Sequence, residues 1–147
     1  MLAFADEPRT LLADLHRRFK GATAATPRHP SMPWLRKALK LPTAPWTNAT
    51  FPLDLRGTPF QKTVWRALQR IGAGQTASYR DIARMIAAPT ASRAVAGACG
   101  ANPVSIAVPC HRIVRSDGSL SGYRWGLSRK RSLLDLEARH ASKSRSR

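Results

Sequence analysis

SYRDIARMIAAPTASRAVAGACG, residues 78–100, is the stretch that decides the fold class. Its pattern of polar and apolar residues predicts two short helices separated by a few residues. Ser78 is placed to cap the first helix, Asp81 follows at the third helical position, and Pro89 forces the end. The second helix is expected to begin at Thr90. Two short helices with so brief a connection predict a helix-turn-helix unit.

The second of these helices is built almost wholly of Ala, Ser, Gly, Val and Cys, and Arg93 is its one long side chain. Small residues let a helix approach another surface closely, either inside the core or against DNA. The whole chain carries 25 Lys and Arg against 8 Asp and Glu, a formal net charge of +17. Coding bias alone can make a protein basic, but this excess favours a polyanionic partner, with nucleic acid as the leading candidate.

Upstream, residues 58–72 read TPFQKTVWRALQRIG and predict one more helix. Thr58 is placed as the N-cap, Pro59 at the first helical position and Gln61 three residues after the cap, which is a capping-box start. The stripe expected to face the core consists of Phe60, Val64, Leu68 and Ile71.

The first 56 residues carry weaker patterns. Two short helical stripes are expected, formed by Leu11, Leu12, Leu15 and Phe19 and, further on, by Leu35 and Leu39. Prolines punctuate the rest. We therefore expect residues 1–56 to form a short helical arm with a proline-rich connector, packed on a domain of residues 57–140. The tail SKSRSR lacks apolar residues, so residues 141–147 are expected to be disordered.

Downstream, GANPVSIAV turns through Asn102 and Pro103 and then predicts a short apolar strand that Pro109 ends. A Gly- and Ser-rich loop follows, and SRKRSLLDLEARH predicts a last helix capped by Ser128. The fold expected from these elements is mainly α: a winged-helix-like helix-turn-helix domain with short strands, preceded by a reduced helical arm.

The first turn of this last helix holds three cations, Arg129, Lys130 and Arg131. Positive charge is unfavourable at a helix N-terminus, which favours anions. One interpretation is that the turn grips a DNA phosphate through Lys130 and Arg131. The other is that these side chains extend into water.

Cys110 and His111 stand side by side in the apolar run VPCHRIV, residues 108–114. Neighbours in a regular strand or helix do not face each other, so a water would have to bridge them, or the backbone would have to turn after Pro109. A nucleophilic thiol with a water-relayed base is one interpretation, and a structural cysteine beside an incidental histidine is another. A metal site is the weakest, because no CxxC or HxxxH spacing links the candidates Cys99, Cys110, His111 and His140.

Glu137 supports the nucleophile interpretation. It falls beside Leu133 and Leu134, on the face that a helix would bury. A buried carboxylate needs a partner, and His111 is a natural one. A position for Glu137 at the solvated edge of the helix is the alternative.

Two cysteines are too few for a disulfide framework, and no run of about 18 apolar residues predicts a membrane span. The N-terminus lacks the hydrophobic segment of a signal peptide. We expect a soluble, cytoplasmic protein with no membrane partner.

The sequences NPVSIAVPCHRIV and GYRWGLSRKRSLLDLE resemble the active-site region of the O6-alkylguanine-DNA alkyltransferases, also called methylated-DNA–protein-cysteine methyltransferases. The similarity continues upstream through RGTPFQKTVWRAL, TASYRDIA and SRAVAGACGANP and covers roughly residues 52–138. Pro-Cys-His-Arg with an upstream Asn-Pro is highly specific. The chain is also similar to the C-terminal half of the bifunctional adaptive-response proteins, without a sign of their zinc module.

The resemblance implies a role for each matching residue of the site. Cys110 is the alkyl acceptor, His111 is its base through a water, and Glu137 holds that histidine. Asn102 braces the turn around the site, while Tyr79 rotates the phosphate and hydrogen-bonds N3 of the guanine.

The remaining matches concern the DNA and the base pocket. Arg93 is the finger that fills the gap left by a flipped base, and Ser92 lies beside it among the DNA-binding positions. The base pocket is implied to consist of Tyr123 as a wall, the backbone of Arg124 as donor to O6, the carbonyls of Cys110 and Ile113 as acceptors for the exocyclic amine, and Cys99 as a lining residue.

The same resemblance implies direct reversal of damage in double-stranded DNA. O6-alkylguanine is flipped out of the stack, with O4-alkylthymine as a second candidate substrate. The alkyl group moves irreversibly to Cys110 in a single turnover by a monomer that needs no cofactor and no metal. Two alternatives are a non-catalytic sensor of alkylated DNA, which Cys110 argues against, and a helix-turn-helix regulator, which leaves Pro-Cys-His-Arg unexplained.

Overall fold

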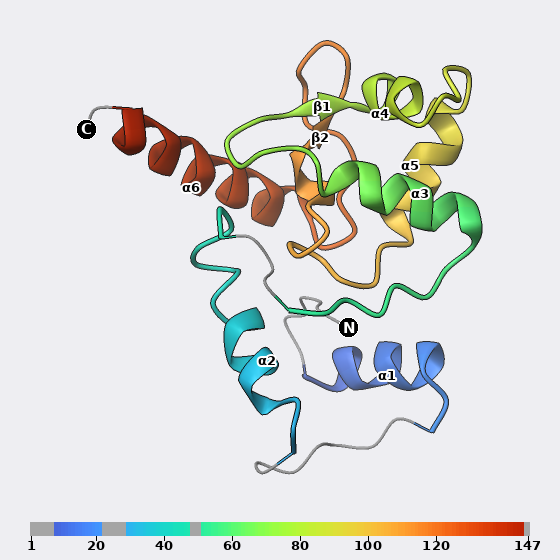
Figure 1. Cartoon of the computed structure of the whole chain (residues 1–147), viewed down its shortest axis with the longest axis vertical. Coiled ribbons are helices and arrows are strands. Elements are labelled where there is room, and N and C mark those ends of the chain that lie inside the picture. The colour runs from blue at the N-terminus through green and yellow to red at the C-terminus, as the bar shows by residue number, and fades with distance from the viewer. Residues whose placement is uncertain (1–7, 22–28, 48–50, 146–147) are drawn as a thin grey trace.

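The computed structural model describes residues 8–21, 29–47 and 51–145 and is mainly helical, so the predicted fold class is confirmed (Figure 1). The described elements are α1 (Pro8–Arg18), α2 (Met32–Ala38), α3 (Pro59–Leu68), β1 (Ala77–Ser78), α4 (Tyr79–Met85), α5 (Ser92–Gly100), the 3-10 helical turn η1 (Cys110–Arg112), β2 (Ile113–Val114) and α6 (Leu127–Arg145). No helix within these ranges is both long and apolar enough to cross a membrane.

Both predicted capping boxes are present. The Thr58 hydroxyl accepts from the backbone N–H of Gln61 at 3.2 Å, and the Gln61 side chain accepts from the backbone N–H of Thr58 at 2.9 Å. Ser78 and Asp81 form the same reciprocal pair at the start of α4, at 3.1 and 2.9 Å. These bonds satisfy N–H groups that a helix leaves free, and they fix where α3 and α4 begin.

The α4–α5 pair forms the predicted helix-turn-helix unit, but its turn differs in detail. Ala87 has a φ of 56° and takes the chain out of α4 before Pro89 is reached. α5 begins at Ser92 rather than at Thr90, and its N-cap residue, Ala91, has no side-chain cap bond. The expected start at Thr90 is therefore wrong by two residues.

The small residues of α5 serve the core on one face. Val95 and Ala98 are buried, and the indole N–H of Trp65 in α3 donates to the Ala98 carbonyl at 2.8 Å. Arg93 lies exposed on the opposite side of the helix. Core packing therefore accounts for part of the small-residue composition, while the long cation remains free for another surface.

The short apolar strand expected before Pro109 is wrong. Residues 102–108 form a compact turn, because the Asn102 amide accepts from the backbone N–H of Val104 and donates to the carbonyl of Val108. These bonds replace those that a strand would make with a neighbour. The strand lies after the cysteine instead: β2 pairs in parallel with β1, with Ala77 opposite Ile113 and Ser78 opposite Val114.

The last helix differs from the prediction at both ends. α6 begins at Leu127, after Gly126 with its φ of 96°, so Ser128 lies inside the first turn and is not the N-cap. The helix continues to Arg145, so the expectation of a disordered tail is wrong for residues 141–145. Ala, Lys, Ser and Arg contain no helix breaker, which allows the last turns to continue. The rest of the predicted tail lies outside the described residues.

The N-terminal arm contains the two predicted helices, α1 and α2, which lie on the same side of the domain in Figure 1. Their apolar stripes are only partly buried: Leu15 and Phe19 are half-buried, while the other described members are exposed. Leu12, Leu35 and Leu39 are 54%, 45% and 64% exposed, and the side chain of Leu11 lies outside the described residues.

The connector after α2 makes the firm contact with the domain. Leu41 and Pro45 are buried, and the Trp46 ring stacks on His140 of α6 with ring centroids 4.2 Å apart. The arm is therefore anchored by its connector rather than by the apolar faces of its helices.

Candidate active site

Cys110 opens the η1 turn directly after Pro109. Its backbone N–H donates to the Val108 carbonyl at 2.8 Å, and its side chain is 7% exposed. The backbone therefore turns at this point, as Pro109 suggested. The cysteine belongs to the buried core of the domain.

The predicted brace, Asn102, touches the thiol. Its side-chain N–H group lies 3.2 Å from Cys110 Sγ and 2.9 Å from the Val108 carbonyl. Its Oδ1 accepts from the backbone N–H of Val104 at 2.9 Å. One buried amide thus fixes the turn that precedes the cysteine and supplies a hydrogen bond to sulfur.

His111 and Glu137 form the pair that the sequence suggested. His111 Nε2 lies 3.0 Å from Glu137 Oε1, and both side chains are fully buried. Because a carboxylate only accepts, Nε2 carries the hydrogen and Nδ1 of the neutral ring is left as a proton acceptor. Nδ1 has no hydrogen-bond partner among the described residues. A buried basic nitrogen is thereby available beside the cysteine.

Arg112, which sequence reasoning missed, completes the charge balance. Its guanidinium bonds both carboxylate oxygens of Glu137, at 2.7 to 3.1 Å, and also donates to the carbonyls of Ile71 at 2.5 Å and Pro45 at 3.1 Å. The backbone N–H of Gly74 donates to Glu137 Oε2 at 3.0 Å. A charged residue inside the apolar run VPCHRIV was the available signal, since a buried Arg needs an anion.

These contacts set the protonation states of the site. Burial opposes the charge on Glu137, but hydrogen bonds from His111, Arg112 and Gly74 outweigh it and lower its pKa to about 2. Burial lowers the pKa of His111 despite its bond to Glu137, so the ring is neutral. Burial raises the pKa of Cys110, against the hydrogen bond from Asn102. The resting site therefore pairs a thiol with a neutral base.

Two tyrosines predicted for the base pocket have hydroxyl partners. Tyr123 is buried, and its hydroxyl lies 2.6 Å from that of Ser105. Tyr79 is half-buried at the start of α4 and accepts from the Ser121 hydroxyl at 3.0 Å. Cys99 is also half-buried, and burial raises its pKa to about 12, which leaves it a poor nucleophile compared with a thiol that has a base.

Lys130 does not lie where a DNA phosphate could meet it, so its predicted role is wrong. Its side chain is fully buried, and its ammonium donates to the carbonyls of Ile113 and, at 2.8 Å, Ser121. These oxygens, rather than an incoming anion, compensate the charge in the first turn of α6. Arg131 of the same turn is exposed, so its predicted contact with a DNA phosphate stays a prediction.

Arg124 connects the pocket loop to the arm. Its side chain bonds Asp14 of α1 at 3.0 Å and lies over the Trp125 ring at 5.0 Å. The role predicted for its backbone is not tested by these contacts.

A basic basin adjoins the helix-turn-helix unit. It has a volume of about 360 Å³ and lies between the β1–α4 corner and the turn after β2. Arg80, Arg84 and Arg115 line it, with Asp81 engaged in its cap to Ser78 and 3.8 Å from Arg84. In Figure 1 this turn, α4 and the start of α5, which carries Ser92 and Arg93, lie along one edge of the molecule. Nothing in the spacing of these three arginines in the sequence predicts that they lie together.

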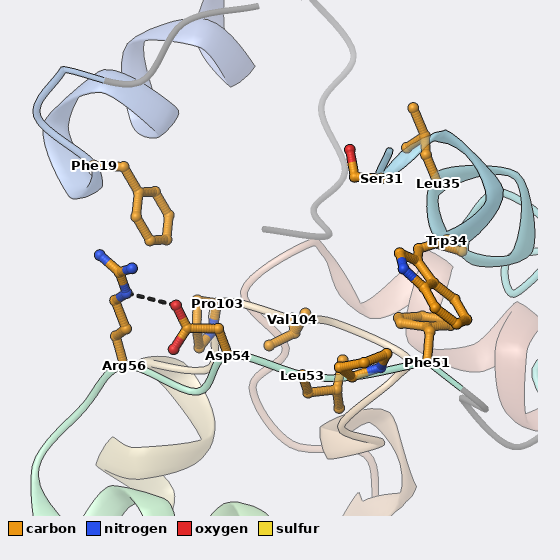
Figure 2. A pocket seen from close by; sticks show the side chains of 12 residues that line it. Phe19, Ser31, Trp34, Leu35, Phe51, Leu53, Asp54, Arg56, Pro103 and Val104 are labelled. Carbon is orange, nitrogen blue, oxygen red and sulfur yellow. Dashed lines mark hydrogen bonds and ion pairs between the residues drawn. The ribbon is translucent and has the colours of Figure 1, made fainter. Parts of the chain in front are cut away.

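A second cavity of about 440 Å³ lies between the arm and the domain, away from Cys110 (Figure 2). Phe19, Trp34 and Phe51 give it an aromatic lining, and the ion pair of Asp54 and Arg56, 2.7 Å long, lies at its side. Within the described ranges, no three His, Cys, Asp or Glu side chains are grouped to hold a metal ion.

Comparison with known proteins confirms the predicted resemblance. The family model described as 6-O-methylguanine DNA methyltransferase, DNA binding domain, matches residues 59–139. The chain is 45% identical over 137 residues to the bifunctional transcriptional activator/DNA repair enzyme Ada of Escherichia coli, covering 93% of this chain and 39% of that protein. It is 56% identical over 95 residues to the inducible methylated-DNA–protein-cysteine methyltransferase of Bacillus subtilis, covering 65% and 53%. The chain thus spans only 39% and 53% of the lengths of these two relatives.

Solved structures share the fold as well. The chain superposes on the Mycobacterium tuberculosis OGT in complex with DNA with a TM-score of 0.69 at 47% identity, covering 74% of this chain and 68% of that one. For the O6-methylguanine-DNA methyltransferase of Pyrococcus kodakaraensis the TM-score is 0.70 at 33% identity, with 92% and 83% covered.

Proposed function

Because this chain belongs to the 6-O-methylguanine DNA methyltransferase family, we propose that it repairs DNA by moving an alkyl group from O6 of guanine to Sγ of Cys110. The observation that carries the proposal is the buried pair of His111 and Glu137 next to the cysteine, with His111 Nδ1 left without a hydrogen-bond partner among the residues that the structure describes. A structural cysteine would need neither a neutral base next to it nor a carboxylate that fixes the tautomer of that base.

The proposed reaction is a single displacement. The Cys110 thiol gives its proton, through a water, to His111 Nδ1, and Glu137 stabilises the imidazolium through its bond to Nε2. The thiolate attacks the alkyl carbon, a carbon–sulfur bond forms, and the bond from that carbon to O6 breaks. The guanine leaves as an anion and takes up a proton, for which the Tyr79 hydroxyl is the proposed donor. The proton that His111 received then passes through water to the Tyr79 oxygen, so both side chains end neutral. The product is a thioether on Cys110, so each chain acts once.

The target carbon lies inside the duplex stack, so the base must first leave it, at a cost of a few kcal/mol. We propose that Arg93, exposed on α5, fills the vacancy, with Ser92 beside it. The arginines of the basic basin are placed to hold the phosphate backbone on the same edge of the molecule. The complete set of groups comes from one chain, and we therefore propose a monomer.

Incubation with a duplex that contains one O6-methylguanine, followed by intact and peptide mass spectrometry, tests the proposal. We expect one methyl group per chain, located on the peptide of Cys110 and absent in Cys110→Ala, which should still bind the duplex. Methylation of Cys99, or removal of the methyl group by Cys110→Ala, would contradict the assignment. A parallel duplex with O4-methylthymine tests the second candidate substrate. Binding of damaged DNA without transfer would indicate a sensor, and sequence-specific binding without transfer would indicate a regulator.

A further inference from the structure

Lys130 is a buried cation whose surroundings contain thiols rather than an anion. Its side chain is fully buried, and its ammonium has two carbonyl partners, Ile113 and Ser121. Within residues 8–21, 29–47 and 51–145, the charged forms that attract it belong to Cys110 and Cys99. Burying a lysine without a carboxylate is costly in solvation free energy. Filling space in the core does not explain this charge, since an apolar side chain would do so at lower cost.

The two carbonyls belong to two separate segments that are proposed to line the base pocket. Ile113 begins β2, directly after the η1 turn that carries the cysteine. Ser121 lies in the loop before α6, and its hydroxyl donates to Tyr79. Two residues later comes Tyr123, which is buried and is the proposed wall of the pocket. The ammonium of Lys130 therefore ties the loop that shapes the pocket to the strand that follows the nucleophile.

The positive charge of the same ammonium favours the thiolate form of Cys110. The titratable groups that face Cys110 are Cys99 from α5, Tyr123 from the pocket loop and Lys130 from α6. The neighbouring His111 is neutral in the resting site, and Lys130 is the cation among these described groups. Burial raises the pKa of Cys110, and the charge of Lys130 counteracts that rise.

We propose that Lys130 is a positioning residue for alkyl transfer: it joins the carbonyls of Ile113 and Ser121 across the base pocket and supplies the fixed positive charge that faces the Cys110 thiolate. This inference rests on the proposed function. The thiol proton leaves through His111, while Lys130 exchanges no proton and forms no bond to the alkyl group. A preorganised ammonium in a site shielded from bulk water stabilises the developing thiolate without having to reorient.

The test measures the thiol directly in the full chain. Iodoacetamide alkylates thiolates, so its rate at Cys110, followed against pH by peptide mass spectrometry, reports the thiolate fraction. Lys130→Gln keeps hydrogen-bond donors without the charge, Lys130→Met keeps the stem alone, and Lys130→Arg keeps the charge. Arg139→Gln, on the exposed side of α6, is the matched control for a lost cation. Near-ultraviolet circular dichroism and thermal melts establish which variants fold.

In the folded Lys130→Gln chain we expect alkylation of Cys110 to be about 10-fold slower at neutral pH, with the midpoint of the profile moved upward by about one unit. Lys130→Arg and Arg139→Gln should keep the wild-type midpoint. A wild-type midpoint in a folded neutral variant, or an equal shift in Lys130→Arg, would overturn the proposal. Loss of the fold in both neutral variants would also overturn it, by assigning Lys130 to the fold alone. Iodoacetamide needs no DNA, so the two failures are distinguishable. A wild-type chain that failed to repair DNA would refute the proposed function, whereas the shift in Lys130→Gln would still show that Lys130 favours the Cys110 thiolate.

Discussion

At the scale of single residues, Glu137 is the carboxylate on which the candidate site depends. Arg112, His111 and the Gly74 N–H all bond it, so its charged form is favoured in the folded chain far more than in the unfolded one. Burial opposes the charge, but these bonds outweigh it and lower the pKa of Glu137 from its ordinary 4.5 to about 2. A carboxylate of this kind adds stability that is fully present above its unfolded pKa and is lost as the pH falls through the folded value.

We therefore predict that Glu137→Gln is less stable than the wild type near neutral pH by about 3–5 kcal/mol, because Arg112 is left buried without its anion. The difference in the free energy of unfolding should shrink between pH 4.5 and about pH 2. Urea unfolding at a series of pH values measures it, with Asp135→Asn on the exposed side of α6 as the control. A difference that stayed constant down to acidic pH would show that the carboxylate of Glu137 is not held charged by the fold.

The sequence predicted the contact between His111 and Glu137 because a carboxylate on a buried helix face needs a partner. It failed for Lys130, since three consecutive cations at a helix start look alike in a sequence. Only the packing of β2 and the pocket loop against α6 separates the buried lysine from the exposed Arg131. The same limit hid Arg112, whose side-chain partners Pro45, Ile71 and Glu137 come from three separate segments of the chain.

At the scale of secondary-structure elements, α5 offers DNA a single long side chain. We predict that Arg93→Ala slows repair of duplex O6-methylguanine by about 10- to 100-fold, because unstacking a base costs a few kcal/mol that this side chain offsets. Reaction with free O6-benzylguanine needs no base flipping and should be nearly unchanged. Single-turnover rates on both substrates measure the ratio. Equal slowing on both would place Arg93 in the pocket or in the fold instead.

A separate prediction concerns the basic basin between α4 and the turn after β2. Arg115→Gln should reduce the slope of log affinity against log salt by about 0.9 on undamaged duplex, the value expected for one lost phosphate contact. Arg131→Gln belongs in the same series, and Arg139→Gln serves as the control away from the basin. Fluorescence anisotropy over a range of salt concentrations gives the slopes. If folded Arg115→Gln kept the wild-type slope, the basin would not contact the backbone.

Helix starts with side-chain caps were predictable, because Thr58 with Gln61 and Ser78 with Asp81 encode their own hydrogen bonds. Elements without such local bonds were predicted less well, since α5 begins two residues later than expected and the strand β2 was missed. The turn of residues 102–108 depends on the side-chain amide of Asn102, which bonds the backbone of both Val104 and Val108. The true strand, β2, needs β1 from more than thirty residues earlier, and no local pattern encodes such a pairing.

At the scale of the whole molecule, the connector after α2 makes the arm part of the domain. Leu41 is 2% exposed and belongs to the same core as Val64 and Leu68 of α3. We predict that Leu41→Ala lowers the free energy of unfolding by about 2–5 kcal/mol in one cooperative transition. Leu39→Ala, at an exposed position in the same segment, should change it little. Two transitions in the wild type, one sensitive to Leu41, would show that the arm unfolds independently.

The contacts of Arg112 should also slow the local opening of the segments that they join. Its guanidinium reaches the connector at Pro45, the end of the α3 segment at Ile71 and the carboxylate of Glu137 in α6. The backbone N–H of Gly74 bonds that same carboxylate. If one of these segments moved away, the buried guanidinium of Arg112 or the buried carboxylate of Glu137 would lose a hydrogen-bond partner. The amide proton of Gly74, although it lies in a loop, should therefore exchange with deuterium as slowly as amides of the central helices.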